Sequence, residues 1–385
     1  MKWGKQTAFI QSGWFLGAIA GLLTGAISGA AITMFRTEPQ LANLSARLAG
    51  VATTSTAPKT PEVNIIPIES RPLVTSLPTV FNESRRSPVL SLVDAATTDT
   101  TITDKQVIGT AIAITSDGWL ITSYESLKGK SLSNVRVIRG GEVVVLEQAI
   151  RDQDTNLVYL KITASGLPVA DFVQPRDVTV GTAVWTERKP SILRPASIMS
   201  VRARSVYETI SSETANRRFL ISGGEEDGVA GQPVWDGRAR LIGLYEKYDA
   251  QLGAWLVEPV GSVARDLANL LKTDTISHAG LSISALDLEG IVLASRPDNL
   301  PSSGAWLRPG GRAIAKESPA FGKLEPGDVI ERVERDILEG RGDLGEILLD
   351  YRPGATVTLT VLRGTEQQKV ELTLAEIKTS VSLMK

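Results

Sequence analysis

The hydrophobic pattern begins with a long apolar stretch near the amino terminus. Residues 6–35 carry no charged side chain; two lysines precede them and an arginine follows. A helix over residues 9–35 would be about 40 Å long, enough to cross the ~30 Å hydrocarbon core of a bilayer. The basic residues in front predict a cytoplasmic amino terminus, with the remaining chain outside the cytoplasm. We therefore expect a cytoplasmic end and one transmembrane helix over residues 1–36; a cleaved signal peptide ending near residues 28–30 is the alternative.

Five glycines recur at every fourth position of this stretch: Gly13, Gly17, Gly21, Gly25 and Gly29. With 3.6 residues per turn they form one stripe along the predicted helix. A stripe without side chains lets another helix approach closely, as small-residue motifs do in lipid. The pattern predicts helix packing through these glycines, either self-association or a partner helix. Membrane helices are also rich in glycine in general, which is the plainer explanation.

The next segment is polar and rich in proline. Residues 37–78 hold six prolines and a Thr/Ser patch at residues 53–56. Such a composition favours a linker over a packed element. As a flexible coil it would span about 35–40 Å. We expect residues 37–78 to hold the folded part away from the membrane.

Short apolar runs separated by turn residues follow from residue 88 onward. The clearest pair is 107–115 and 119–124, joined by the turn signal Ser116-Asp117-Gly118. Further runs lie at residues 135–138, 142–150, 157–162, 183–186, 198–204, 218–221, 233–235 and 241–245. So many short strands predict an all-β barrel or sandwich. A helix over 260–272, with Val263, Leu267, Leu270 and Leu271 on one face, would close a domain of residues 79–274.

The remaining pattern mixes strands with one helix. Strands are expected at residues 291–294, 304–307, 312–317, 356–363 and 369–374, and a helix at 343–351. This order predicts a small α+β module over residues 275–378.

Composition narrows the chemistry. The formal net charge is −2 and no block of like charges is long enough for a polybasic arm, so we expect no nucleic acid partner. The chain has no cysteine and one histidine, His278, which excludes thiol nucleophiles and makes a histidine-based zinc site improbable. It has no glycine-rich phosphate loop between a strand and a helix and no calcium-loop spacing. We expect no cofactor and no metal, and we interpret His278 as a linker residue between the two folded parts.

Several motifs resemble one known family. Residues 324–330 read LEPGDVI and residues 356–363 read TVTLTVLR, similar to the PDZ domain that follows the protease domain of HtrA/DegP proteins. Residues 109–129, GTAIAITSDGWLITSYESLKG, resemble the family pattern GSGFIIxxDGxILTNxHVVxG, and GVAGQPV at 228–234 stands where the family has GNSGGPL. The resemblance covers residues 87–376. It implies a mainly β fold: a trypsin-like double β-barrel, then an α+β PDZ domain, behind the predicted transmembrane helix.

The resemblance also implies that the catalytic triad is replaced. Glu125 stands at the histidine position, Asn156 at the aspartate position and Ala230 at the serine position. Acyl transfer needs a hydroxyl nucleophile, an imidazole to take its proton and a carboxylate to orient that imidazole. Gln232 replaces a glycine of the loop, and three acidic residues at 225–227 would oppose the negative charge that an oxyanion hole stabilises. The sequence therefore predicts no protease activity, with no catalytic residue.

The PDZ resemblance implies a peptide groove. Such domains add an extended peptide to a sheet edge beside a helix, and loop N–H groups hold a terminal carboxylate. By resemblance the loop falls near residues 279–282, the groove strand near 283–285 and the groove helix near 344–348. The implied peptide-binding residues are Gly280, Leu281, Ser282, Ile283, Leu344 and Leu348.

These expectations combine into a function hypothesis. The chain would be a membrane-anchored pseudoprotease of the inner membrane, with extracytoplasmic, periplasmic domains that bind a peptide or protein as a scaffold. A chaperone-like holder of unfolded chains and a regulatory subunit of an active HtrA protease are alternatives. A residual serine endopeptidase of envelope protein quality control is the least favoured alternative.

Overall fold

The computed structural model describes the carboxyl-terminal four fifths of the chain: residues 78–81, 86–95, 101–189, 192–201, 209–213, 217–223, 228–289, 291, 293–310, 313–339 and 343–384. The predicted transmembrane helix, its glycine stripe, the linker up to residue 77 and the acidic residues 225–227 lie outside these ranges. Within them, no helix has the length and apolar character needed to span a bilayer.

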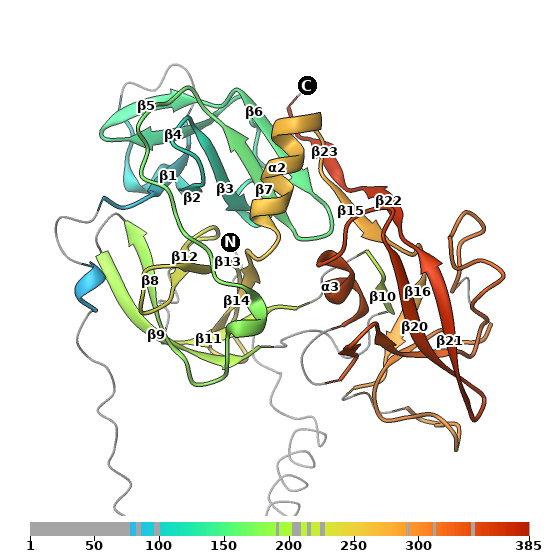
Figure 1. Cartoon of the computed structure of the whole chain (residues 1–385). Coiled ribbons are helices and arrows are strands. Elements are labelled where there is room, and N and C mark those ends of the chain that lie inside the picture. Colours follow the sequence, from blue (N-terminus) through green and yellow to red (C-terminus); the bar gives the residue numbers. More distant parts are fainter. Residues whose placement is uncertain are drawn as a thin grey trace, which may run out of the picture. The chain divides into compact units, whose positions relative to one another are not determined.

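The first half of the β-rich region forms an eight-stranded sheet (Figure 1). Its order is β23-β6-β7-β3-β2-β1-β4-β5 and all neighbours are antiparallel. The strands are β1 (Val89–Asp94), β2 (Val107–Ala113), β3 (Trp119–Ser123), β4 (Val135–Arg139), β5 (Glu142–Val145), β6 (Gln148–Asp152), β7 (Leu157–Lys161) and β23 (Ser380–Ser382). The turn signal between β2 and β3 acts as expected, because Gly118 adopts φ 110° and a Cβ there would lie 2.1 Å from the carbonyl oxygen of Ile162.

The second half closes into a six-stranded barrel. Its strands follow the order β11-β14-β13-β12-β8-β9. They are β8 (Ala183–Lys189), β9 (Ile192–Ser200), β11 (Phe219–Ser222), β12 (Pro233–Trp235), β13 (Leu241–Asp249) and β14 (Ala254–Pro259). Closure leaves no unpaired edge. The core contains stacked rings of Tyr245 and Trp255, with centroids 4.4 Å apart. A further apolar cluster, with Ile121 of β3 and Trp235 of β12, joins sheet and barrel.

The predicted helix after the barrel is α2 (Val263–Thr273). Val263 and Leu270 are buried, but Leu271 is 61% exposed, so the apolar face is narrower than expected. The helix ends at Asp274, whose left-handed φ of 54° turns the chain. Four short 3₁₀ turns complete this region: η1 (Thr79–Phe81), η2 (Asp104–Gln106), η3 (Tyr124–Ser126) and η4 (Pro175–Asp177).

The α+β module has its own sheet and core. Its strands are β16 (Ser284–Asp287), β17 (Ala305–Trp306), β18 (Val329–Val333), β19 (Asp336–Ile337), β20 (Thr356–Arg363) and β21 (Glu366–Thr373), with helix α3 (Leu344–Leu349) and a separate pair, β15 (Ser277–Gly280) and β22 (Ala375–Lys378). The strands expected at 291–294 and 312–317 are not formed: the described part of the first is irregular, and Ile314 makes only an isolated bridge to Ile283.

Two strands pair outside the part of the sequence to which they belong. β10 (Thr209–Ser211), from the connection between β9 and β11, joins the edge of the module's sheet through β16. β23, after the module, pairs with β6 of the first sheet. Both add hydrogen bonds to strands that would otherwise be edges. The β-rich part and the module therefore each contribute one strand to a sheet of the other.

Candidate functional site

Glu125, Asn156 and Ala230, the three positions expected to correspond to a catalytic triad, lie in segments that contact one another or the same sheet. Glu125 belongs to η3, directly after β3, and the N–H of Tyr124 donates to the carbonyl oxygen of Asn156 at 2.9 Å. The carbonyl oxygen of Ala230 accepts from the N–H of Thr110 on β2 at 3.2 Å. The segments around residues 125 and 156 are thus hydrogen-bonded to each other, and the segment around residue 230 is hydrogen-bonded to β2.

Each polar replacement is engaged in contacts of its own. Glu125 pairs with Lys128, with a shortest distance of 3.1 Å. The Asn156 amide donates to Glu246 Oε1 at 3.2 Å, while its oxygen accepts from Arg151 Nη2 at 3.1 Å. A carboxylate could accept from the arginine but could not donate to Glu246. The amide at 156 therefore suits its neighbours, and no described contact directs it toward Glu125.

The loop around Ala230, expected at the nucleophile position, carries no hydroxyl or thiol in its described residues 228–232. Ala230 carries only a methyl group, and the buried Gln232 folds back so that its Oε1 accepts from the N–H of Val229 at 3.4 Å. Gly231 is required, because a Cβ there would lie 2.2 Å from the carbonyl oxygen of Thr110. The nearest serine hydroxyl, Ser126, is buried and shares a 3.1 Å hydrogen bond with Thr122. We find no base beside it among the described contacts.

The residues implied for a peptide groove lie together in the module. Leu281, Ile283, Leu344 and Leu348 are all buried in one apolar cluster. They therefore belong to the apolar core of the module, beneath the expected groove between β16 and helix α3. Gly280 ends β15, and Ser282 adopts a left-handed φ of 50°. This turn aims successive N–H groups to one side, which is the geometry of an anion-binding backbone nest.

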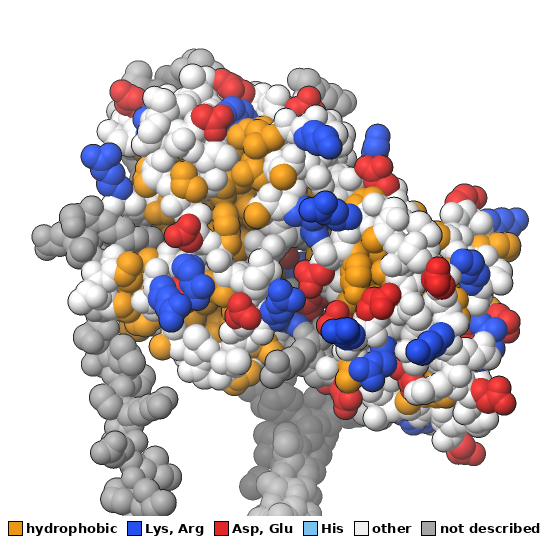
Figure 2. Space-filling model, in the orientation of Figure 1, with side chains coloured by type: hydrophobic (Ala, Val, Ile, Leu, Met, Phe, Trp, Pro, Cys, Tyr) orange, Lys and Arg blue, Asp and Glu red, His pale blue; other side chains and the backbone are white. Residues whose placement is uncertain are grey.

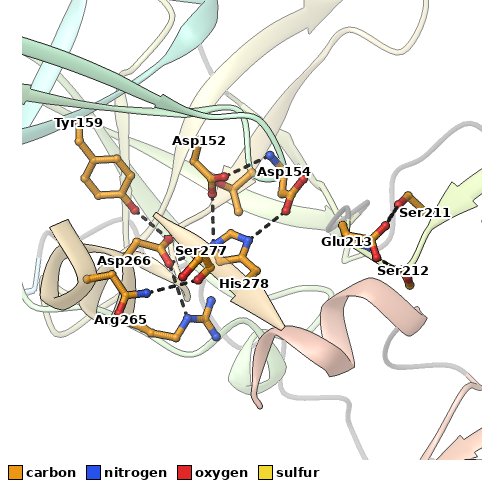
Figure 3. Close-up of polar contacts among 12 residues, drawn as sticks. Asp152, Asp154, Tyr159, Ser211, Ser212, Glu213, Arg265, Asp266, Ser277 and His278 are labelled. Atoms are coloured by element: carbon orange, nitrogen blue, oxygen red, sulfur yellow. Dashed lines mark hydrogen bonds and ion pairs between the residues drawn. The ribbon is translucent and has the colours of Figure 1, made fainter. Parts of the chain in front are cut away.

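His278 is the functional group that the sequence interpretation missed. It is not a linker residue: it lies in β15, 1% exposed, among acidic side chains of β6, the turn that follows β6, and α2 (Figure 3). Its Nδ1 is 3.1 Å from Asp154 and its Nε2 is 3.1 Å from Asp266 and 3.6 Å from Asp152. The contact joins the α+β module to the first sheet and to α2.

The charge state of this cluster follows from its geometry. Burial alone would lower the pKa of His278, but the hydrogen bonds to Asp154 and Asp266 and the charge of Asp152 outweigh it and raise the pKa to about 10. Asp152, Asp154 and His278 offer ligand atoms within 4.8 Å of one another, the arrangement of a candidate metal group among the described residues. A protonated imidazole donates from both nitrogens, so His278 in that form would supply a positive charge among these carboxylates.

Charges on the surface are mixed in sign. On the face drawn in Figure 2, Lys and Arg side chains are interspersed with Asp and Glu side chains. Nonspecific nucleic acid binding uses a concentrated basic face. The arrangement on this face fits the predicted lack of a nucleic acid partner, which stays a prediction.

Comparisons with known proteins agree with this architecture. Residues 302–374 match the family model "PDZ domain". The chain is 24% identical over 284 residues to "Protease Do-like 1, chloroplastic" of Arabidopsis thaliana, covering 69% of this chain and 63% of that protein. It is 23% identical over 282 residues to "Probable periplasmic serine endoprotease DegP-like" of Halomonas elongata, covering 71% and 57%. The chain thus spans less than two thirds of the length of these curated relatives.

Solved structures of similar fold are HtrA-type proteases. "HtrA-type protease AlgW with tripeptide" aligns with TM-score 0.55 and 16% identity, over 77% of this chain and 96% of that chain. "HtrA-type protease AlgW with decapeptide" aligns with TM-score 0.53 and 16% identity, over 76% and 96%. At such identity the likeness establishes the fold. Together with the PDZ match, the likeness gives this chain the fold of HtrA-type proteases: a trypsin-like β fold followed by a PDZ domain.

Proposed function

We propose that this protein is a catalytically inactive HtrA-type protein that binds peptides or protein segments through its PDZ domain. The observation that carries the proposal is Ala230 at the nucleophile position, on a loop held against β2 with no hydroxyl or thiol to attack a carbonyl. Glu125 and Asn156 support it, because each is engaged with neighbouring charges and neither can act as an imidazole or an orienting carboxylate.

The PDZ groove is the candidate binding site. Peptide recognition there uses backbone N–H and C=O groups, which are present whichever side chains the groove strand carries. The left-handed Ser282 and the apolar floor beneath the groove strand support this use. The similar solved structures are described as complexes with a tripeptide and a decapeptide. We propose the same class of ligand, an extended peptide, for Gly280, Leu281, Ser282, Ile283, Leu344 and Leu348 here.

We place the folded domains outside the cytoplasm, tethered by a single transmembrane helix at residues 1–36 and a linker at 37–78. The apolar stretch without charge and the basic residues before it support this proposal. The relative from Halomonas elongata is described as periplasmic, in agreement with it. The glycine stripe would join this helix to a second copy or to a partner helix.

Proteolysis of casein by the full chain in detergent micelles tests the central claim. The matched comparison is the triple variant Glu125→His, Asn156→Asp, Ala230→Ser, which restores the three side chains that acyl transfer needs. We expect the natural chain to leave casein intact over a day, at the level of a mock purification, and the restored chain to cleave it. Cleavage by the natural chain above the mock level would refute the proposal.

A further inference from the structure

The PDZ groove is occupied by a strand of the same chain. β10 leaves the connection between β9 and β11 and lies between α3 and β16 (Figure 1). It pairs antiparallel with β16, with Ser211 opposite Ser284. The N–H of Ser212 continues the ladder by donating to the carbonyl oxygen of Ile283 at 2.9 Å. An extended peptide that adds to a sheet edge beside a helix makes the same backbone contacts.

The end of this strand fills the loop expected to bind a carboxylate. The N–H of Ser282 donates to Glu213 Oε1 at 2.6 Å. The N–H groups of Leu281 and Ile283 donate to Ser212 Oγ at 3.3 and 3.2 Å. Three consecutive backbone donors are therefore all used by two residues of the chain. Hydrogen bonds to an ionised acceptor are about twice as strong as neutral ones, so the carboxylate is the stronger anchor.

The Glu213 carboxylate is held on its other sides as well. Ser212 Oγ donates to Oε1 at 2.6 Å, and the hydroxyl of Ser211 donates to Oε2 (Figure 3). Gly280 leaves room for it, because a Cβ at that position would lie 2.7 Å from Glu213 Oε1. This side-chain carboxylate stands where the terminal carboxylate of a peptide ligand would be expected.

A second contact holds the chain where it returns toward the barrel. Arg217 Nε lies 2.8 Å from Glu346 Oε1 on α3, and the arginine side chain is only 6% exposed. The next residue, Arg218, pairs with Glu246 at 2.5 Å and with Glu258 at 2.6 Å inside the barrel region. The strand in the groove is thus anchored at the groove helix on one side and in the barrel on the other.

We propose that residues 209–213 are an intramolecular ligand of the PDZ groove, and that a peptide with a free carboxyl terminus binds by displacing them. The inference rests on the proposed function, since it takes the groove as the peptide site. Both ligands need the N–H groups of residues 281–283, so they cannot be bound together. A tethered ligand acts at a high effective concentration, and the apparent affinity for an external peptide falls by the fraction of molecules whose groove is open.

The test uses a peptide copied from the strand itself, VYETISS (residues 206–212) with a free carboxyl terminus, and its amidated form. Binding to the full chain in detergent micelles is measured by fluorescence anisotropy. Glu213→Ala removes the internal carboxylate, and Ser212→Pro removes both the N–H that bonds Ile283 and the hydroxyl. The matched control is Glu371→Ala, an exposed glutamate on β21.

We expect both groove variants to bind the free-acid peptide at least about tenfold more tightly than the natural chain, and Glu371→Ala to bind as the natural chain does. Amidation should weaken binding to every variant. Hydrogen exchange provides a readout that needs no ligand: the amides of Ser212, Leu281, Ser282 and Ile283 should exchange faster in Glu213→Ala than in Glu371→Ala.

The outcomes separate this inference from the proposed function. Unchanged exchange in Glu213→Ala, or equal peptide affinity in the natural chain and both groove variants, overturns the internal ligand and leaves peptide binding intact. Faster exchange with no peptide bound by any variant supports the internal ligand and contradicts the proposed peptide-binding function.

Discussion

The candidate cleft around residues 125, 156 and 230 and the candidate PDZ groove present different kinds of chemical group. In the cleft, Glu125 pairs with Lys128, Asn156 contacts Arg151 and Glu246, and Ala230 carries only a methyl group. In the groove, the N–H of Ser282 donates to the Glu213 carboxylate, and the N–H groups of Leu281 and Ile283 donate to the Ser212 hydroxyl. Catalysis needs three particular side chains in one geometry. Peptide binding needs backbone groups, which substitution leaves in place as long as the fold persists. The proposed combination of an inactive cleft and a working groove would follow from this difference, because substitutions change side chains and leave the backbone groups in place.

His278 connects the PDZ domain to the trypsin-like part of the chain. Substituting this residue therefore tests whether the two parts form one folded unit. His278→Gln would remove the cation that Asp152, Asp154 and Asp266 share, leaving Arg265 near Asp266 alone, at a cost of about 3–5 kcal/mol in the free energy of unfolding. Chemical denaturation followed by tryptophan fluorescence measures this. The control, Lys189→Ala, removes an exposed pair with Asp104 and should cost less than about 1 kcal/mol. Equal stability of the two variants would contradict a structural role for the cluster.

Raising the pH should weaken the contacts of His278 with its acidic neighbours without any mutation. The pKa of His278 rises from 6.5 in the unfolded chain to about 10 in the fold, so its stabilisation is complete below pH 6.5 and is lost as pH rises toward 10. We expect the free energy of unfolding to fall by up to a few kcal/mol over this window. Other groups titrate near its upper end, so the measured quantity is the difference between the natural chain and His278→Gln. If the difference in the free energy of unfolding between the two chains stays constant over this pH range, His278 is not protonated in the fold.

The smallest effect should come from Ala230→Ser alone. The new hydroxyl would have no imidazole to remove its proton, so a fluorophosphonate probe of serine hydrolases should leave the variant unlabelled. Stability should change by less than about 0.5 kcal/mol, as for most substitutions away from a tightly packed core. The affinity for the VYETISS peptide should equal that of the natural chain. Labelling of the single variant would show that some other base serves the cleft.

The sequence carried the local part of this structure well. Short apolar runs separated by turn residues predicted most strands of the sheet and the barrel. The Ser116-Asp117-Gly118 turn formed because glycine accepts the positive φ at a position crowded by Ile162. The motifs around 125, 156, 230 and 324–330 were contiguous, so resemblance could locate them. The strands expected at 291–294 and 312–317 did not form in the described residues, because an apolar run does not by itself provide a neighbouring strand to pair with.

By itself, then, the sequence determined the mainly β architecture and the order of the trypsin-like part and the PDZ domain. Only the tertiary structure decided that His278 lies buried among acidic side chains, that β10 pairs with β16 in the PDZ domain, and that β23 returns to β6. Those three features depend on partners far away along the chain, such as Asp154 for His278, 124 residues apart. A local pattern reports the period of burial. It carries no information about which distant group completes a charge pair or a strand edge, because that is set by how the packed elements meet.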